Sequence, residues 1–383
     1  MSPEIPAPPG PLQSAHSGLH SEHGARRGEH PGRAANPVIK VRDLAWLSFE
    51  KPDLDRAERF ARDFGLTVAT RTRDELRLRG TLEGTDAIVI RRGAVSRFVG
   101  PVFQADDHAD LERLARHTGA RVRPLGPGQP GAVVDLTDPT GVPVGVVYGA
   151  QSYDALPEQV ALPLNTGTRP ARINAAQRPA REPARVQRLG HLVLQTPRFA
   201  AALDWYVEAL GMIVSDFLFL PGQRDLGPTM AFLRCDRGTT PADHHTLAMH
   251  LSPGRGYVHS AYQVTDLDAI AAGGEYLAER GYRRTWGIGR HIQGSQLFDY
   301  WRDPDRLMVE HFADGDLFDC TVEPGWAPMT ASGLAQWGPP VTRDFLGTAP
   351  SPARLREAFQ ALRAADTELT TSRLLALLKA MSS

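Results

Sequence analysis

The fold of this chain follows from the stretch 189–194, which reads Leu-Gly-His-Leu-Val-Leu and leads through a proline into an amphipathic segment that ends at Gly211. The same order occurs earlier, where 44–47 reads Leu-Ala-Trp-Leu and an amphipathic segment ends at Gly65. A short apolar run predicts a strand, the 3.6-residue period predicts a helix, and a glycine after it is a stop signal. The chain therefore contains the same strand–helix unit twice.

Two further pairs of motifs support a duplication. The segment 98–100, Phe-Val-Gly, matches 257–259, Tyr-Val-His, and the dipeptide at 138–139 matches the one at 303–304, both Asp-Pro before an apolar strand. Each block also divides into two halves with one strand, one helix and then further strands. We therefore predict an α+β fold made of four βαβββ modules in two tandem domains.

Composition and patterning divide the chain into five parts. The first part is rich in Pro, Gly, His, Ser and Arg, and such a segment buries too little apolar surface to offset its ordering entropy. Periodic apolar residues begin near Val38, and the pattern is interrupted in 151–185 and again after 318. The expected parts are a disordered tail at 1–36, a first domain at 37–150, a linker at 151–185, a second domain at 186–318, and a loop and helix extension at 319–383.

The overall composition disfavours several classes of protein. Among 383 residues, 43 are basic and 44 acidic, so the formal net charge is −1 and neither nucleic acid nor a membrane is an expected partner. The chain shows neither a run of about 18 apolar residues nor the apolar core of a secretory signal. Its two cysteines, Cys235 and Cys320, have no partner at metal or redox spacing, which favours the cytoplasm. The apolar period of 351–381 is typical of a helix that packs on a neighbouring subunit or covers a domain, and we expect a homo-oligomer.

The chemistry is concentrated in the second block. His191, His259 and Glu310 each interrupt an apolar strand, whereas the first block has Trp46, Gly100 and Gly145 at the matching places. A buried imidazole or carboxylate needs a partner, because its desolvation otherwise costs several kcal/mol. Two histidines and one carboxylate around an ion with open positions suit Fe(II) and O₂ chemistry. We therefore predict a non-haem metal site in the second block and an inert first block.

Residues 38–312 resemble the type I extradiol ring-cleaving dioxygenases of the vicinal oxygen chelate superfamily, whose domains are glyoxalase-like. The matching segments are Leu-Gly-His-Leu-Val-Leu at 189–194, His-His-Thr-Leu-Ala-Met at 244–249, His-Ser-Ala-Tyr-Gln-Val at 259–264, Gly-Arg-His at 289–291, and Phe-Asp-Tyr-Trp-Arg-Asp-Pro at 298–304. The resemblance implies an enzyme that opens a catechol-type ring with O₂ as co-substrate. It also implies Fe(II), or Mn(II), as the metal.

The resemblance also implies a role for individual residues. It places the metal on His191, His259 and Glu310, and a second set of side chains, His245, His291 and Tyr300, around the aromatic diol. In the family, the residue matching His245 lies beside the O₂ position and acts as acid–base catalyst. The residues matching His291 and Tyr300 hydrogen-bond the bound catecholate. An imidazole with a pKa near 6.5 suits such a proton transfer.

Two other functions are compatible with the same fold. One is a metal-dependent glyoxalase-like lyase or isomerase, which usually draws its ligands from two domains or subunits. The other is a non-catalytic ligand-sequestering protein of the bleomycin-resistance type, which needs no intact ligand set. The ligands of this chain all lie in one block, which favours ring cleavage. Monocyclic, bicyclic and trihydroxylated rings are all compatible with these residues, and so are proximal and distal cleavage.

His244 and His250 are expected on the opposite strand face from His245.

Overall fold

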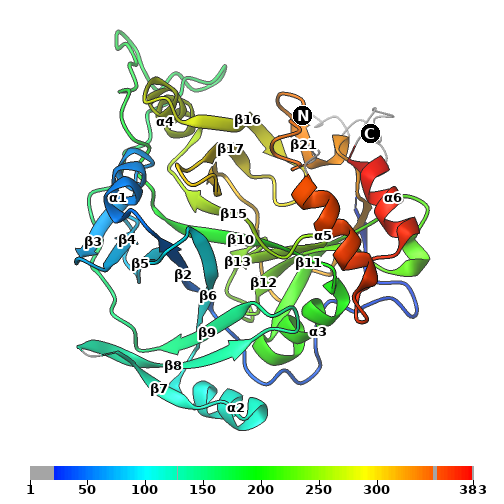
Figure 1. The fold of residues 1–383 in the computed structure, drawn as a ribbon. Helices are drawn as coiled ribbons and strands as arrows, with labels where there is room; N and C mark the ends of the chain where they lie inside the picture. The colour runs from blue at the N-terminus through cyan, green and yellow to red at the C-terminus, as the bar shows by residue number, and fades with distance from the viewer. Residues whose placement is uncertain (1–20, 127, 348–351, 382–383) are drawn as a thin grey trace, which may run out of the picture.

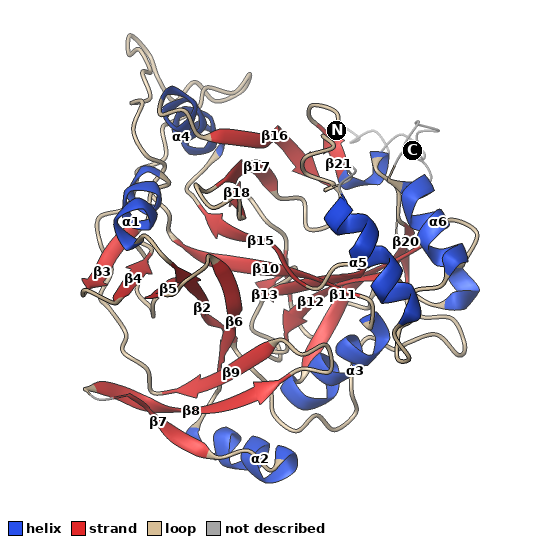
Figure 2. Ribbon diagram, viewed as in Figure 1, coloured by secondary structure: helices blue, strands red, loops and turns tan. Residues whose placement is uncertain are grey.

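The computed structural model describes residues 21–126, 128–347 and 352–381, and it contains two large mixed β-sheets, a separate two-stranded sheet and helices packed against the large sheets (Figure 1). Helices and strands are interspersed throughout the chain (Figure 2), and the α+β class predicted from the sequence is confirmed. Among the described residues, no helix is long and apolar enough to cross a membrane.

The first sheet contains two βαβββ modules. Its strands lie in the order β3-β4-β5-β2-β6-β9-β8-β7, so the first strands of the two modules are neighbours at the centre. The N-termini of both helices are capped by aspartates, Asp53 and Asp107, which satisfy backbone N–H groups of the first turn. The elements are β2 (Asp43–Lys51), α1 (Leu54–Asp63), β3 (Thr67–Arg71), β4 (Glu75–Arg79), β5 (Ile88–Arg92), β6 (Arg97–Gln104), α2 (His108–Thr118), β7 (Val122–Gly126), β8 (Gln129–Thr137) and β9 (Pro143–Tyr148).

The second sheet repeats this plan and is extended at both edges. Its main strands lie in the order β11-β12-β14-β10-β15-β18-β17-β16, with β20 and then β1 added beside β11, and β21 added beside β16. The main elements are β10 (Arg188–Thr196), α3 (Phe199–Leu210), β11 (Met212–Phe219), β12 (Met230–Cys235), β14 (Leu247–Leu251), β15 (Gly256–Gln263), α4 (Leu267–Glu279), β16 (Arg283–His291), β17 (Leu297–Arg302) and β18 (Met308–Ala313). The added elements are β1 (Glu22–His23), η1 (Arg224–Leu226), the pair β13 (Ala242–Asp243) and β19 (Leu317–Phe318), β20 (Gly325–Pro328), η2 (Ser332–Leu334), β21 (Ala335–Trp337), α5 (Pro352–Arg363) and α6 (Thr371–Ala380).

The strand register confirms that the two blocks are structural repeats. In the second sheet His191 pairs with Ala261, which pairs with Glu310 on the next strand. In the first sheet Trp46 pairs with Val102, which pairs with Gly145. His259 and Gly100 also correspond. His259 pairs with Val193, two positions after His191, and Gly100 pairs with Ser48, two positions after Trp46. A β-bulge precedes both Trp46 and His191, so even the irregularity is repeated.

Part of the N-terminal segment differs from the expectation. Residues 21–36, which we expected to be disordered, dock on the second sheet, where β1 pairs with β20. Arg224 pairs with both Glu22 and Glu29 and anchors this segment. Ion pairs and strand pairing at the edge of the second sheet, rather than burial of apolar side chains, therefore order this segment. Neither kind of contact can be predicted from amino-acid composition. The remainder of the expected tail, 1–20, lies outside the described residues.

One continuous apolar core joins the two sheets. It includes residues of both repeats, and Phe64 after α1 stacks on His311 of β18 with ring centroids 3.8 Å apart. A buried ionic cluster crosses the same boundary, where the Lys51 ammonium contacts Asp303 and lies 2.8 Å from Asp305. These contacts fix the turn that leads into β18, the strand that carries Glu310.

Candidate metal centre

Three neighbouring strands bring His191, His259 and Glu310 together. His191 lies on β10, His259 on β15 and Glu310 on β18, and all three are buried, with Glu310 fully inaccessible to solvent. Nε2 of each histidine lies 3.3 Å from Glu310 Oε2. One ligand atom from each residue lies within 4.8 Å of the others, and within the described part of the chain this is the one cluster with such geometry.

The polar atoms of this cluster need a partner that the protein does not supply. Both Glu310 oxygens, both His259 nitrogens and Nδ1 of His191 are buried without a hydrogen-bond partner. Buried polar groups are rarely left unpaired, because each unpaired group costs about 1–3 kcal/mol. A divalent cation bound by one carboxylate and two imidazoles supplies that partner, so the residues present fit an Fe(II) or Mn(II) ion.

The electrostatics also favour an ionised carboxylate. Burial alone would raise the pKa of Glu310, but the imidazoles of His191 and His259, each 3.3 Å away, outweigh burial and hold its pKa well below the usual range. Burial lowers the pKa of His259 despite the neighbouring carboxylate. An ionised Glu310 beside a neutral His259 is the protonation pattern that metal binding requires.

His291 and Tyr300 lie next to the ligand cluster on β16 and β17. The Leu334 carbonyl can only accept, so His291 Nδ1 donates to it over 2.7 Å. Burial lowers the pKa of His291 to about 4, and its neutral Nε2 accepts the Tyr300 hydroxyl at 2.7 Å. Burial and then the Glu310 charge raise the pKa of Tyr300, which keeps it a phenol. This pair lies against the cluster, since His291 Nε2 is 3.9 Å from Glu310 Oε1.

His245 lies on the connection between β13 and β14, next to His191. Its ring centroid is 4.1 Å from that of His191, and its ring meets Phe232 edge-on. Burial, followed by repulsion from four neighbouring histidines, lowers its pKa well below the usual value. A neutral imidazole of this kind can accept a proton from a group bound beside it. The structure thus gathers around the ligand cluster the three further residues that the resemblance had suggested.

The C-terminal extension supplies part of the wall around this site. Phe345 packs edge-on to Tyr300 at 4.8 Å and also contacts Trp286, while Leu334 joins the same small apolar cluster. These contacts were missed in the sequence, where the extension showed only turns and a later helix. Its Gly338-Pro339-Pro340 turn was the available signal, because the Pro339 carbonyl accepts the Trp286 indole N–H at 2.9 Å.

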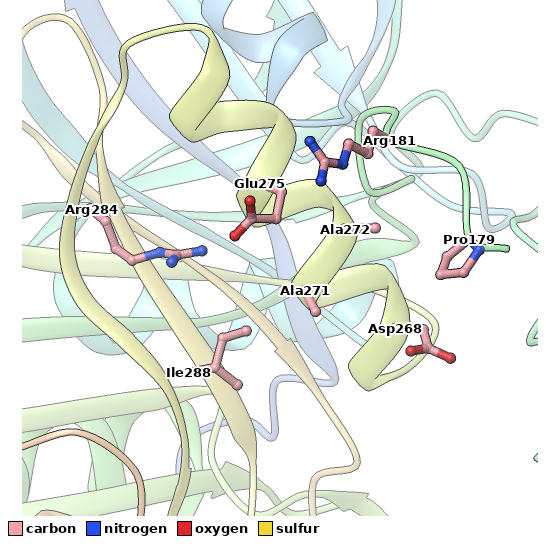
Figure 3. A pocket seen from close by; sticks show the side chains of 8 residues that line it. All are labelled: Pro179, Arg181, Asp268, Ala271, Ala272, Glu275, Arg284 and Ile288. Atoms are coloured by element: carbon pink, nitrogen blue, oxygen red, sulfur yellow. The ribbon is translucent and has the colours of Figure 1, made fainter.

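Among the described residues, the first sheet has no group of side chains equivalent to this cluster. Trp46 and Val102 pack there in an apolar cluster. A side chain at Gly100 would begin 1.9 Å from the Pro143 carbonyl oxygen, so a histidine does not fit at that position without a backbone shift. The surface hollow in Figure 3 is also unrelated to the cluster, because it is lined by other residues, among them Arg181, Glu275 on α4 and Arg284 on β16.

Comparisons with known proteins agree with this geometry. Residues 188–311 match the family model of the glyoxalase/bleomycin resistance protein/dioxygenase superfamily. The chain is 31% identical to metapyrocatechase 2 of Cupriavidus necator over 338 residues, which cover 85% of this chain and 98% of that protein. A substrate complex of homoprotocatechuate 2,3-dioxygenase from Brevibacterium fuscum superposes with a TM-score of 0.66 at 19% identity, covering 84% of this chain and 96% of that one. A Mn(II)-bound glyoxalase from Novosphingobium aromaticivorans superposes with a TM-score of 0.65 at 20% identity, covering 88% and 99%.

Proposed function

Because the chain belongs to the extradiol ring-cleaving dioxygenases of the vicinal oxygen chelate superfamily, we propose that His191, His259 and Glu310 hold its catalytic metal. The protein is an oxidoreductase that opens a catechol-type aromatic ring with O₂ at a non-haem Fe(II) centre. The observation that carries the ligand assignment is the set of five buried polar atoms on these residues that have no hydrogen-bond partner. The same donors also suit Mn(II).

A metal held by His191, His259 and Glu310 would lower the pKa of a phenol bound to it and would bring the diol and O₂ together. The remaining work falls to the protein. We propose that neutral His245 accepts a phenolic proton at one ring nitrogen and later returns it to an oxygen of the opened product. Burial keeps the imidazole unprotonated at neutral pH, so it is available as a base before the reaction begins.

We assign His291 and Tyr300 to binding and orienting the diol. Their mutual hydrogen bond fixes both side chains, and the Leu334 carbonyl fixes the imidazole from behind. Because the Tyr300 hydroxyl stays protonated, it can donate to a substrate oxygen that carries negative charge. The apolar wall of Trp286, Met308 and Phe345 excludes water from the same space.

The test compares two variants of the full chain purified without oxygen. Glu310→Ala removes a ligand, so we expect loss of the metal that the unaltered protein retains at about one ion per chain. His245→Phe leaves the ligands intact, so we expect normal metal content but loss of O₂ uptake and of the yellow ring-opened product from catechols. His250→Phe, in the same region but outside the cluster, is the matched control and should keep both. Loss of metal in His245→Phe would refute the division between ligands and catalyst.

A glyoxalase-like isomerase is the competing activity on this fold. It needs no O₂, so turnover of a catechol that continues unchanged under argon would favour it. The ligand arrangement argues against it, because all three candidate ligands come from one sheet and the first sheet has no room for a histidine at Gly100. Mass spectrometry of the product after ¹⁸O₂ labelling distinguishes the two, since only ring cleavage incorporates both oxygen atoms.

We further propose a division of labour between the two repeats. Residues 37–150 form a non-catalytic domain, 151–185 a linker and 186–318 the catalytic domain, followed by the extension to 383. The proposal is supported by the filled apolar space around Trp46 and by the metal-type cluster in the second sheet.

We also propose that the enzyme is a cytoplasmic homo-oligomer acting on a small aromatic diol. Cys235 and Cys320 are both free thiols, which suits a reducing compartment. Four exposed apolar side chains on α5 and α6, Leu355, Phe359, Leu375 and Leu378, offer a surface for a second copy. Light scattering of the full chain, with Phe359→Ser and Leu375→Ser as a disrupting pair, tests the assembly. A monomer in the unaltered protein would refute it.

A further inference from the structure

Behind His245 lies a chain of polar groups that the mechanism above does not use. His244 is adjacent in sequence, and its side chain is fully buried between the rings of Phe232 and Phe318. Its Nδ1 lies 3.1 Å from Nδ1 of His245. Its other nitrogen, Nε2, lies 2.7 Å from a carboxylate oxygen of Asp216 on β11. A continuous hydrogen-bonded chain therefore runs from Asp216 through His244 to His245.

The chemistry of the three groups gives this chain a direction. An ionised carboxylate can only accept, so Nε2 of His244 carries the proton in the contact with Asp216. With its single proton on Nε2, the His244 ring has its lone pair on Nδ1, so Nδ1 of His244 accepts. The proton between the two rings therefore belongs to Nδ1 of His245, which donates it. A neutral His245 with a proton on Nδ1 has its lone pair on Nε2, at the opposite edge of the ring.

The surroundings hold the chain rigidly. The Ser21 hydroxyl donates to the second oxygen of Asp216 at 2.9 Å, so that carboxylate is fixed from both sides. The backbone of His244 is fixed as well, because its N–H donates to the Asp316 carbonyl at 2.9 Å and its carbonyl accepts from the Ser215 hydroxyl at 2.5 Å. Rigid outer partners of this kind orient catalytic groups in many active sites.

We propose that Asp216 and His244 are positioning residues that hold His245 in the tautomer whose Nε2 is unprotonated. The inference rests on the acid–base role proposed for His245. It adds a reason why the buried imidazole presents a lone pair to the diol rather than an N–H. When Nε2 takes a phenolic proton, the resulting positive charge lies one imidazole away from the Asp216 carboxylate, which stabilises it.

Asp216→Asn tests the direction of the chain. With the amide oxygen kept on the Ser21 hydroxyl, which donates at this position in the unaltered protein, the amide NH₂ faces His244. The hydrogen bonds then reverse, and His245 receives a proton on Nε2. We expect kcat to fall about 100-fold with KM changed less than about threefold and metal content unchanged. An unchanged kcat in a folded, metal-loaded Asp216→Asn protein would overturn the proposal.

Two substitutions of His244 provide a second test if Asp216→Asn does not fold. His244→Phe fills the space but offers no acceptor, whereas His244→Asn places an amide oxygen near the position of Nδ1. We expect the kcat of His244→Asn to be at least ten times that of His244→Phe. A role in packing alone predicts that the larger His244→Phe side chain is the better replacement, and that result would refute the chain.

A double mutant separates this proposal from the role of His245 itself. In a His245→Phe background, Asp216→Asn should lower the residual kcat no further, because the residue through which it acts is gone. A full effect in that background would overturn the positioning role. A fully active His245→Phe single variant would instead refute the proposed function of His245, and the inference with it.

A spectroscopic readout is independent of turnover. In the full chain loaded with diamagnetic Zn(II), ¹⁵N NMR of labelled histidine distinguishes protonated from unprotonated ring nitrogens. We expect His245 to be protonated on Nδ1 in the unaltered protein and on Nε2 in Asp216→Asn. The same tautomer in both proteins would contradict the proposal.

Discussion

Replacing Lys51 by methionine should destabilise the whole protein, because it removes the cation from a buried cluster that joins the two repeats. The Lys51 side chain is only 6% exposed and contacts Asp303, also 6% exposed, and Asp305, 9% exposed. Methionine keeps most of the volume and all of the apolar stem, so the change is mainly one of charge. The perturbation therefore isolates the electrostatic part of this contact.

The expected magnitude follows from what each carboxylate retains. Asp305 keeps the Arg56 guanidinium as a partner. Asp303 keeps two backbone N–H groups, from Asp305 and Leu307, but loses its only cation among the described contacts. Removing one partner of a buried ion pair typically costs 3–5 kcal/mol, and the retained hydrogen bonds place this case at the lower end. We expect the free energy of unfolding to fall by about 3 kcal/mol at pH 7.

The stability lost in Lys51→Met depends on pH through the titration of Asp303. Burial raises the pKa of Asp303, and Lys51 opposes that rise. Without Lys51 the folded-state pKa rises further above the unfolded value. The carboxyl then favours folding only when protonated, below the unfolded pKa, and that stability is lost as the pH rises through the folded pKa. The deficit of Lys51→Met should therefore be full at pH 7 and shrink towards pH 4.

Urea unfolding followed by tryptophan fluorescence measures this difference in the metal-loaded full chain. Arg97→Met is the matched control. Arg97 pairs with Glu50, the residue next to Lys51 on β2, but this ion pair is exposed to solvent. That control should leave the unfolding midpoint unchanged within error. A Lys51→Met deficit below about 1 kcal/mol, or one that grows towards low pH, would refute the buried-charge reasoning.

Three other changes have equally definite outcomes. Chelation of the metal should lower the melting temperature of the unaltered protein, since an ion at 1,000 times its dissociation constant contributes about 4 kcal/mol, and calorimetry should show no such shift in Glu310→Ala. Phe345→Ala should enlarge the space beside Tyr300 and shift kcat/KM towards diols with a bulky substituent, and an unchanged substrate ranking in O₂ uptake would argue against that wall. Asp43→Asn should stabilise the protein at pH 7 by at most about 3 kcal/mol, because burial raises the Asp43 pKa to about 6 and the ionised form opposes folding above pH 4. Denaturant unfolding at pH 7 and at pH 4 should show this gain only at the higher pH.

The repeat and the candidate ligand set could be predicted without a structure because both depend on local sequence patterns. Each strand–helix unit carries its own apolar period and stop signal, so the first and second blocks can be aligned position by position. That alignment sets Trp46 against His191 and Gly145 against Glu310, and the strand pairing of the two sheets has the same correspondence. A histidine or carboxylate inside an apolar strand is visible in one dimension, because its neighbours alone predict burial.

The outer parts of the site depend on contacts that no local pattern contains. Asp216 lies 28 residues from His244, and a β-bulge between Val214 and Asp216 redirects the carboxylate, so simple alternation along the strand does not place it. Phe345 reaches the site from a segment that adds β21 to the edge of the sheet. Residues 21–36 are ordered through charge pairs with Arg224, far along the chain.

The sequence by itself thus predicted the duplicated α+β scaffold and the three candidate ligands, because period and residue type encode them locally, and the family resemblance added His245, His291 and Tyr300. Only the tertiary structure decided the Asp216–His244 chain and the Phe345 wall beside these residues, and the Lys51 cluster between the repeats. Each of these joins side chains from separate elements, and the distance between such side chains is set by sheet register, bulges and packing rather than by their spacing along the chain.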